Sequence, residues 1–471
     1  MSFCSCSRIV RSTTCWEHFT NLTPAFPIEA ACRPAFQILT GQPASLHGKP
    51  RRAVRHTIPY PDPNEDYVNM QAQIGNGSMQ GFVADYATVK GANPIDIMQY
   101  YVAANVPVTY ALAMAYAASD RYFASGPVQS WPNRLFSLCG TPGYNPSKKL
   151  AYLNNSDYPG YPFINGQLNY MSIFEQLDNA GASWKIYYDD LLAIAALVAY
   201  VNNKLSNVVP FDNFFSDVTN NTLPAFSLIE PRYQMFSFLA GDKAPTSNHP
   251  GDSLADGSSG IAISISCGEQ LLANVFQALA LNSELFATTL LIVTYDEHGG
   301  LFDHVPPPPA VSPFAQNQVT TGFNYDSYGV RVPALFINPY VQPGLFPPLS
   351  AAALPAFDHT SILAALRDQF GLSGSLSPRV DIAPTFTGLI NPSQQPISPP
   401  TIAVPQCVWS PPSSQGHAEP IVRTMIRRGS YDRAEVESGK ILGRDLTGAY
   451  RSGCVVLPSF FGGAGPALRR I

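Results

Sequence analysis

The sequence predicts an α/β fold in which helices cover a sheet of mostly parallel strands. The first observation is an apolar, β-rich run from Thr288 to Asp296, which is typical of a strand buried on both faces of a parallel sheet. The second is the alternation of such runs with segments of helical spacing, which favours a layered α/β domain. The third is size, because 471 residues with 45% hydrophobic side chains supply one large core, or a core with a smaller appended unit.

Two helical segments are expected early in the chain, from Ile95 to Ala104 and from Val108 to Ser119. The stretch from Met98 to Ser119 carries no charge, which raises the question of a membrane span. Pro107 interrupts this stretch, so it predicts a pair of buried helices instead.

Four further elements are expected along the chain. Ser183–Asp190 alternates between apolar and polar residues and predicts a strand. Gly268–Leu281 has apolar residues at helical spacing and predicts a helix. Val330–Tyr340 predicts another strand, and Ser361–Gln369 predicts another helix.

Composition divides the chain into three parts. Residues 1–55 lack periodicity and are expected to be irregular, whereas residues 56–390 form one continuous globular domain. Residues 391–471 are rich in Pro and Ser and then basic, so a disordered tail is expected. The net charge of −5 provides no basic excess, which argues against nucleic acid as a partner. The first thirty residues lack the apolar stretch of a secretory signal.

The spacing of the cysteines does not predict a zinc site. None of the eight has zinc-finger spacing, and no cluster of histidines accompanies them. They are therefore interpreted as loose or buried thiols. Their positions are Cys4, Cys6, Cys15, Cys32, Cys139, Cys267, Cys407 and Cys454.

The segment from Leu290 to Pro309 carries the first candidate site. Its apolar strand ends in Asp296, Glu297 and His298, and ligands bind at the carboxyl ends of strands in α/β sheets. Two adjacent carboxylates suit a hard divalent metal ion, and His304 follows after a short loop. The alternative interpretation is a solvated strand end followed by a glycine turn.

A second candidate site lies between Ser125 and Thr141. Pro132 fits the first turn of a helix, which places Ser130 at the N-terminus of that helix. Such a position favours an anionic ligand such as phosphate, and a hydroxyl there is a candidate nucleophile when a metal lowers its pKa. The alternative is a serine that only caps the helix.

Two weaker candidates contain histidines. His249 lies in a polar turn and is a candidate for binding a phosphoryl oxygen or protonating a leaving group. His359 precedes a helical pattern, where Asp358 or Thr360 alternatively serves as the cap. The sequence contains no Walker A loop, no GxSxG elbow and no HExxH helix. These absences argue against a P-loop nucleotide-binding protein, an α/β-hydrolase and a zinc protease of the zincin type.

Taken together, these segments resemble the phosphoesterase family that contains phospholipases C and acid phosphatases. The similarity covers roughly residues 35–390, and its ordered motifs are long enough to be specific. The matching motifs are Gly126-Pro127 with Ser130-Trp131-Pro132-Asn133-Arg134, Gly140-Thr141, Phe174-Glu175-Gln176-Leu177 with Trp184 and Tyr187, Glu230-Pro231-Arg232-Tyr233, Ser247-Asn248-His249-Pro250, Tyr295-Asp296-Glu297-His298-Gly299-Gly300, Asp303-His304-Val305-Pro306, Tyr328-Gly329-Val330-Arg331-Val332-Pro333 and Asp358-His359-Thr360-Ser361.

The resemblance implies a three-layer α/β/α sandwich of the alkaline-phosphatase type that hydrolyses phosphoric esters with a divalent metal ion. It implies that a metal-activated serine attacks phosphorus and that water hydrolyses the resulting phosphoserine. The implied roles are Ser130 as nucleophile, His249 and His304 as catalytic residues, Asp296 and Glu297 as metal ligands, and Asn133, Arg134, His298 and His359 as substrate-binding residues.

The sequence also departs from the family pattern. Family members carry a Glu-Asn segment on the first strand that supplies metal ligands, and no such segment is found here. Family members also usually carry a histidine near the Pro-Asp-Pro turn, whereas here Pro61-Asp62-Pro63 continues into Asn64-Glu65-Asp66. Residues 257–267 resemble an insertion. These departures keep open the alternative of a catalytically impaired pseudoenzyme or binding protein on the same fold.

The choice between a phosphodiester and a phosphomonoester substrate stays open at this stage. The phospholipase resemblance implies that the partner is a phospholipid at a membrane surface. No transmembrane segment is predicted in the chain itself. Members of the family are often exported or surface-associated, but the sequence itself predicts no location.

Overall fold

The computed structural model describes ten ranges of the chain. They are residues 51–52, 58–159, 161, 168–189, 197–232, 244–250, 263–348, 355–386, 388–409 and 453–458. The predicted irregular segment 1–55 lies outside these ranges except for Arg51–Arg52, and so does most of the predicted tail. The proposed insertion is described only from Ile263 onward.

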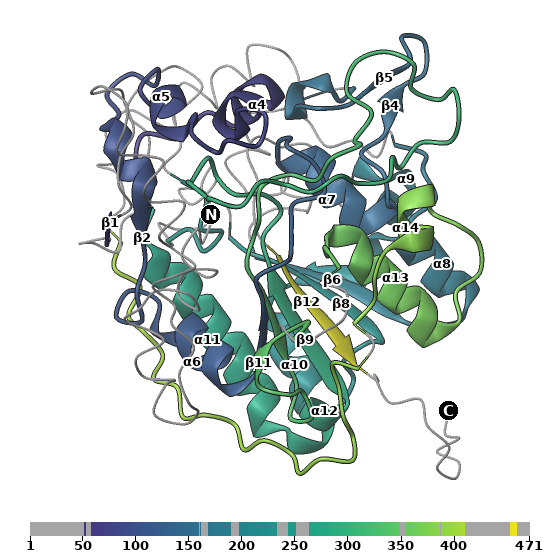
Figure 1. The fold of residues 1–471 in the computed structure, drawn as a ribbon. Coiled ribbons are helices and arrows are strands. Elements are labelled where there is room, and N and C mark those ends of the chain that lie inside the picture. Colours follow the sequence, from purple (N-terminus) through teal and green to yellow (C-terminus); the bar gives the residue numbers. More distant parts are fainter. Residues whose placement is uncertain are drawn as a thin grey trace, which may run out of the picture.

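An eight-stranded mixed sheet lies at the centre of the described part of the chain (Figure 1). Six strands run in one direction, whereas β10 and β12 run antiparallel to their neighbours. In spatial order the strands are β11 (Gly344–Leu345), β3 (Ala117–Ser119), β10 (Ala334–Ile337), β9 (Thr289–Thr294), β12 (Gly453–Pro458), β8 (Phe226–Glu230), β6 (Trp184–Tyr188) and β7 (Val208–Pro210). The α/β class predicted from the sequence is therefore confirmed.

Strand β9 shows how the sheet separates two hydrophobic clusters. Leu290 and Ile292 point into one cluster, whereas Leu291 and Val293 point into the other. Helices α7 (Ser130–Cys139), α8 (Ile173–Asn179) and α13 (His359–Phe370) contribute to the first cluster. Helices α6 (Pro107–Ala115), α10 (Asp212–Thr219), α11 (Ile265–Leu281) and α12 (Ser283–Ala287) contribute to the second. Both faces of β9 are thus buried, which explains its continuous apolar sequence.

The remaining elements are short and surround this core. The helices are α4 (Tyr67–Ile74), α5 (Phe82–Tyr86), α9 (Ala199–Asn202) and α14 (Pro378–Ile382). The 3-10 turns are η2 (Pro94–Met98), η3 (Asn155–Asp157) and η5 (Leu205–Asn207). Two strand pairs lie outside the main sheet, namely β1 (Arg51–Arg52) with β2 (Gln99–Tyr100) and β4 (Tyr144–Asn145) with β5 (Leu150–Ala151).

Two of the expected helices are wrong in part. The segment Ile95–Ala104 forms only a 3-10 turn, and then Gln99–Tyr100 pairs with Arg51–Arg52 as strand β2. The segment Val108–Ser119 is helical only as far as Ala115, because Ala117–Ser119 joins the sheet between β10 and β11. Pairing in the sheet outweighs the high helix propensity of these alanines. Among the described helices, none has the length and hydropathy to span a membrane.

The thiol interpretation is wrong for two cysteines. Cys267 in α11 forms a disulfide with Cys407, which follows it by 140 residues. Around this bond residues 402–408 lie along α11, where Gln277 donates to the carbonyl of Ile402 at 2.7 Å and Gln270 to that of Pro405 at 3.0 Å. Sequence spacing missed this bond because the partners meet only through the tertiary fold.

We predict that loss of this disulfide destabilises the protein. Replacing both Cys267 and Cys407 by serine should lower the free energy of unfolding by about 2–5 kcal/mol, since the bond closes a long loop in the unfolded chain. Guanidinium unfolding without reductant measures this loss, and added reductant should lower the stability of only the parent protein. An unchanged unfolding midpoint in the double variant would contradict the prediction.

Candidate functional site

The candidate site lies where β8 and β9 end. Asp296 follows β9 by two residues, and Glu230 is the last residue of β8. The two strands run in the same direction, so their carboxyl ends lie at the same edge of the sheet. The helices α4, α7 and α13 and the turn at residues 61–65 contact this edge, and they bring several of the predicted site residues together.

The loop after β9 is fixed by a chain of hydrogen bonds. Gln73 of α4 donates to Asp85 at 2.8 Å, so its amide oxygen is left to accept from Nε2 of His298 at 2.8 Å. His298 Nδ1 lies 3.4 Å from a carboxylate oxygen of Glu297. Burial alone would raise the pKa of Glu297, but His298 and the N–H of Gly299 together hold that pKa below its ordinary value. Glu297 is therefore a buried carboxylate in its ionised form.

A group of possible metal ligands lies beside this loop. Asp62, Glu65 and His249 each offer one ligand atom, and these atoms all lie within 4.8 Å of one another. Glu65 and His249 are buried, and the side chain of Asp62 is 20% exposed. Two carboxylates and an imidazole are a donor set that zinc and manganese accept. The donor chemistry therefore fits the divalent ion that the sequence predicts.

The turn that carries Asp62 and Glu65 is held in place by α5. Tyr86 donates its hydroxyl to the carbonyl of Pro61 at 2.7 Å, and Asn64 donates to Thr88 at 2.9 Å. A Cβ atom on Gly300 would lie 2.5 Å from Cβ of Pro63, so this close approach requires glycine, whose φ is also positive at +69°. The turn and the loop after β9 are thus in direct contact.

His359 joins the same loop from α13. Its Nε2 lies 2.8 Å from the backbone carbonyl of Asp296, so Nε2 carries the proton and donates. Burial lowers the pKa of His359 below its ordinary value, even though Asp358 and this carbonyl oppose the shift. A neutral His359 thus positions the backbone of Asp296. Asp358 forms a capping box with Ser361, which fixes the start of the helix.

Helix α7 carries three of the predicted residues. Ser130 is its first residue and is fully buried, while the N–H of Trp131 donates to Asn155 at 2.9 Å. Asn133 donates to the carbonyl of Val128 at 2.7 Å, so it holds the turn that leads into the helix. Arg134 forms a buried ion pair with Glu230, which joins the helix to the end of β8.

His304 is placed by a different set of contacts. Arg331 donates to both carboxylate oxygens of Asp303 at 2.7 and 2.8 Å, and Asp303 accepts from the N–H of His304 at 2.6 Å. Burial would raise the pKa of Asp303, but the Arg331 guanidinium outweighs it and lowers the pKa. The imidazole of His304 is partly exposed and lies 3.4 Å from Asp303. Its predicted catalytic role stays a prediction.

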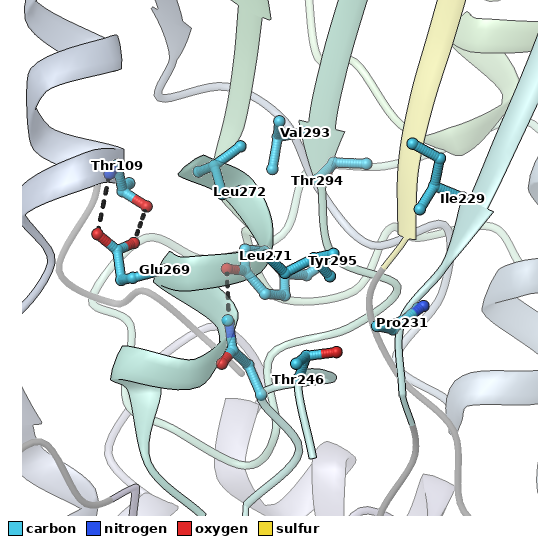
Figure 2. A pocket seen from close by; sticks show the side chains of 12 residues that line it. Thr109, Ile229, Pro231, Thr246, Glu269, Leu271, Leu272, Val293, Thr294 and Tyr295 are labelled. Carbon is cyan, nitrogen blue, oxygen red and sulfur yellow. Dashed lines mark hydrogen bonds between the residues drawn. The ribbon is translucent and has the colours of Figure 1, made fainter. Parts of the chain in front are cut away.

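A small cavity lies behind the site, next to Tyr295 and Thr246 (Figure 2). Its volume of about 30 Å³ is enough for water but not for a phosphoester. On its far side the buried carboxylate of Glu269 accepts from the N–H and the hydroxyl of Thr109 (Figure 2). It also accepts from the N–H of Val108 at 2.6 Å. Glu269 of α11 thereby caps the N-terminus of α6.

We predict a pH-dependent stability that depends on Glu269. Burial raises its pKa from 4.5 to about 7, although the donors on Thr109 and Val108 oppose the shift. The pKa of Glu269 is higher in the folded protein than in the unfolded chain, so its protonation stabilises the fold. This stabilisation is complete below about pH 4.5 and is lost as the pH rises through 7. From pH 5 to pH 8 the free energy of unfolding of the parent protein should therefore fall by about 3 kcal/mol relative to that of a Glu269→Gln variant.

Urea unfolding at both pH values, with the exposed Glu284→Gln variant as control, measures this difference. The control should follow the parent protein at each pH. If the difference between the parent and Glu269→Gln is the same at pH 5 and pH 8, the assigned direction of the pKa shift is wrong.

Four of the nine predicted site residues lie in or contact the loop after β9. Asp296, Glu297 and His298 belong to that loop, and His359 contacts it at the carbonyl of Asp296. The loop also touches the turn beside His249. Asp62 and Glu65 were not predicted from the sequence as candidate ligands. The signal that indicates them is a pair of acids three residues apart in a proline-rich turn.

Comparison with known proteins gives consistent matches. The model of the phosphoesterase family matches residues 40–373. Non-specific phospholipase C3 of Arabidopsis thaliana is 31% identical over 347 residues, which cover 71% of this chain and 57% of that protein. Non-specific phospholipase C6 of the same plant is 30% identical over 353 residues, or 70% of this chain and 61% of that protein.

A bacterial relative matches to a similar extent. Phospholipase C A of Mycobacterium tuberculosis is 28% identical over 345 residues, which cover 66% of this chain and 59% of that protein. The chain therefore spans less than two thirds of the length of each of these three relatives.

Proposed function

Because this chain belongs to the phosphoesterase family, we propose that it hydrolyses phosphoric ester bonds and that phospholipids are its substrates. The names of the plant and bacterial relatives support a phospholipase C type of reaction, which releases a phosphorylated headgroup. The substrate would be presented at a membrane surface.

One observation carries this proposal. Buried acidic and imidazole side chains from separate segments meet at the carboxyl end of parallel strands, where α/β folds bind ligands. Such a concentration of ionisable groups costs free energy unless it binds something, and so it favours a catalytic site over a purely structural one.

The metal is proposed to bind at Asp62, Glu65 and His249. Asp296 and Glu297 stay a second proposed ligand pair, because the family resemblance assigns them that role. A divalent ion at such a site neutralises charge on a phosphoryl group and lowers the pKa of a bound hydroxyl. On this proposal His249 acts as a metal ligand, whereas the sequence suggested that it binds a phosphoryl oxygen or protonates the leaving group.

Ser130 is proposed as the nucleophile. It opens a ten-residue helix, whose N-terminus favours the negative charge of a phosphoryl group. Attack of its hydroxyl oxygen on phosphorus would release the lipid alcohol, which takes up a proton, and would leave the phosphorylated headgroup esterified to the serine. Water would then hydrolyse this ester, which releases the phosphorylated headgroup and restores the serine hydroxyl. Arg134 shares its charge with buried Glu230, so its proposed role is to hold α7 against β8 as well as to bind substrate.

We also propose the three-layer arrangement of the alkaline-phosphatase type. Apolar residues from helices line both faces of β9, and six of the eight strands in the described sheet run in one direction. Both features support a sheet that lies between two layers of helices.

An assay with two chromogenic substrates tests the function. The purified chain is expected to hydrolyse p-nitrophenylphosphorylcholine or p-nitrophenyl phosphate when a divalent metal is added, and the faster substrate distinguishes a diesterase from a monoesterase. Metal bound at Asp62, Glu65 and His249 without any turnover would instead support a pseudoenzyme or binding protein. A folded protein that neither binds metal nor turns over either substrate would refute the proposed site.

A further inference from the structure

A second cleft lies beside the candidate site, at the carboxyl ends of three neighbouring parallel strands. Asp189 follows β6, Asp212 lies two residues after β7, and Arg232 lies two residues after β8. The strands β7, β6 and β8 are paired in parallel, so their ends open on the same edge of the sheet. The cleft has a volume of about 290 Å³, which is close to the lower limit for small-molecule sites.

The cleft is connected directly to the segment that carries His249. Arg232 accepts at its carbonyl from the N–H groups of Thr246 and Ser247, at 3.0 and 3.1 Å. The N–H of Arg232 in turn donates to the hydroxyl of Thr246 at 2.9 Å, and Thr246 lines the cleft. A group bound in the cleft would therefore lie next to the wall from which His249 extends.

The charged pair in the cleft is neutral overall. One guanidinium nitrogen of Arg232 donates to both carboxylate oxygens of Asp189, at 2.9 and 2.7 Å. Another donates to the carbonyl of Ala244 at 2.8 Å, which leaves the Nε–H as a buried donor without a hydrogen-bond partner among the described residues. This donor requires an acceptor oxygen such as that of a hydroxyl group, and the Asp212 carboxylate adds one negative charge beyond the ion pair, which disfavours an anion.

The remaining polar groups include both donors and acceptors. Gln270 uses its amide N–H₂ on Pro405, which leaves its oxygen as an acceptor. Asp212 contributes a carboxylate and Asn274 an amide that both donates and accepts. Hydroxyl groups also donate and accept at once, so this mixture matches a ligand with several hydroxyls. The ring of Phe211 supplies an apolar wall for the C–H face of such a ligand.

We propose that this cleft binds a neutral, hydroxyl-rich headgroup, such as the inositol of a phosphoinositide, while the phosphoryl group lies at the His249 site. This inference rests on the proposed phosphoesterase function and names its substrate class. It predicts a preference for polyol headgroups over choline, because a trimethylammonium group can neither donate to nor accept from the polar groups of the cleft.

Filling the cleft provides the test. Asn274 is exposed on α11, so Asn274→Trp should fold normally and place an indole in the cleft. Its kcat/KM for phosphatidylinositol vesicles should fall at least about tenfold, since the headgroup loses its hydrogen bonds. The values for phosphatidylcholine vesicles and for p-nitrophenyl phosphate should change less than about threefold. Asn202→Trp, at an exposed helical position outside the cleft, is the matched control.

Two results would overturn the inference. One is an unchanged kcat/KM of Asn274→Trp on phosphatidylinositol. The other is an equal loss of kcat/KM on phosphatidylinositol and on phosphatidylcholine. If the parent protein hydrolyses neither lipid, the inference is tested by binding instead. Saturation-transfer NMR then compares the binding of free myo-inositol with that of choline. Binding that Asn274→Trp removes would support the cleft while refuting the hydrolase, and no binding would refute the cleft.

Discussion

Replacing Ser130 by alanine is expected to lower kcat by at least about 10³-fold on every phosphoester that the protein hydrolyses. The physical reason is that the proposed reaction passes through a bond between the Ser130 oxygen and phosphorus, which alanine cannot form. The change should leave the fold intact, because serine and alanine are similar in size and both are compatible with the start of a helix. Steady-state rates measured on the parent and variant proteins test it.

A second serine on the same helix supplies the control for this experiment. Ser137 lies two turns further along α7 and donates to the carbonyl of Arg134 at 2.7 Å. Ser137→Ala is expected to retain activity within about threefold. If Ser130→Ala keeps more than a tenth of the parent kcat, Ser130 is not the nucleophile, and the serine is only the first residue of the helix.

The second large effect is expected at the metal ligands. Glu65→Gln keeps the size of the side chain but removes its charge, so the affinity for divalent metal should fall at least about 100-fold. Asp62→Asn should do the same. Calorimetric titration with Mn²⁺ or Zn²⁺ measures this directly and does not depend on turnover. Activity at a fixed metal concentration should fall in parallel and should recover in part when more metal is added.

An exposed carboxylate tests whether this loss is specific. The side chain of Asp368 is 54% exposed and pairs with Arg367, its neighbour in the sequence. Asp368→Asn is expected to bind metal as tightly as the parent protein. Equal affinity in Glu65→Gln and the parent would show that the three side chains do not hold the metal, and Asp296 with Glu297 would become the remaining candidates.

The regular elements were predictable wherever one strong local signal decided them. Strand β9 and helices α11 and α13 lie within three residues of their expected bounds, because a doubly buried strand and an amphipathic helix each leave a clear pattern. Ala117–Ser119 was not predictable from local sequence. Its alanines favour a helix, and only their pairing with β10 and β11 turns them into a strand.

The segments that contribute to the candidate site were predictable from the sequence, but the way in which they meet in space was not. The acids after β9 follow from the rule on strand ends, and the structure places them at such an end. Asp62 lies 187 residues before His249 in the sequence, and nothing local to either residue indicates that they meet. The disulfide between Cys267 and Cys407 could not be predicted for the same reason, since the two cysteines meet only when the segment that carries Cys407 packs against α11.

That disulfide has a topological consequence for the molecule. Its bond turns the chain between residues 267 and 407 into a covalent ring that contains β9, β10, α13 and the acids at Asp296 and Glu297. A protease that cuts the backbone once inside this ring opens it without releasing a fragment. The two pieces separate only after reduction, so a nicked molecule under oxidising conditions would keep both halves of its site in one covalent unit.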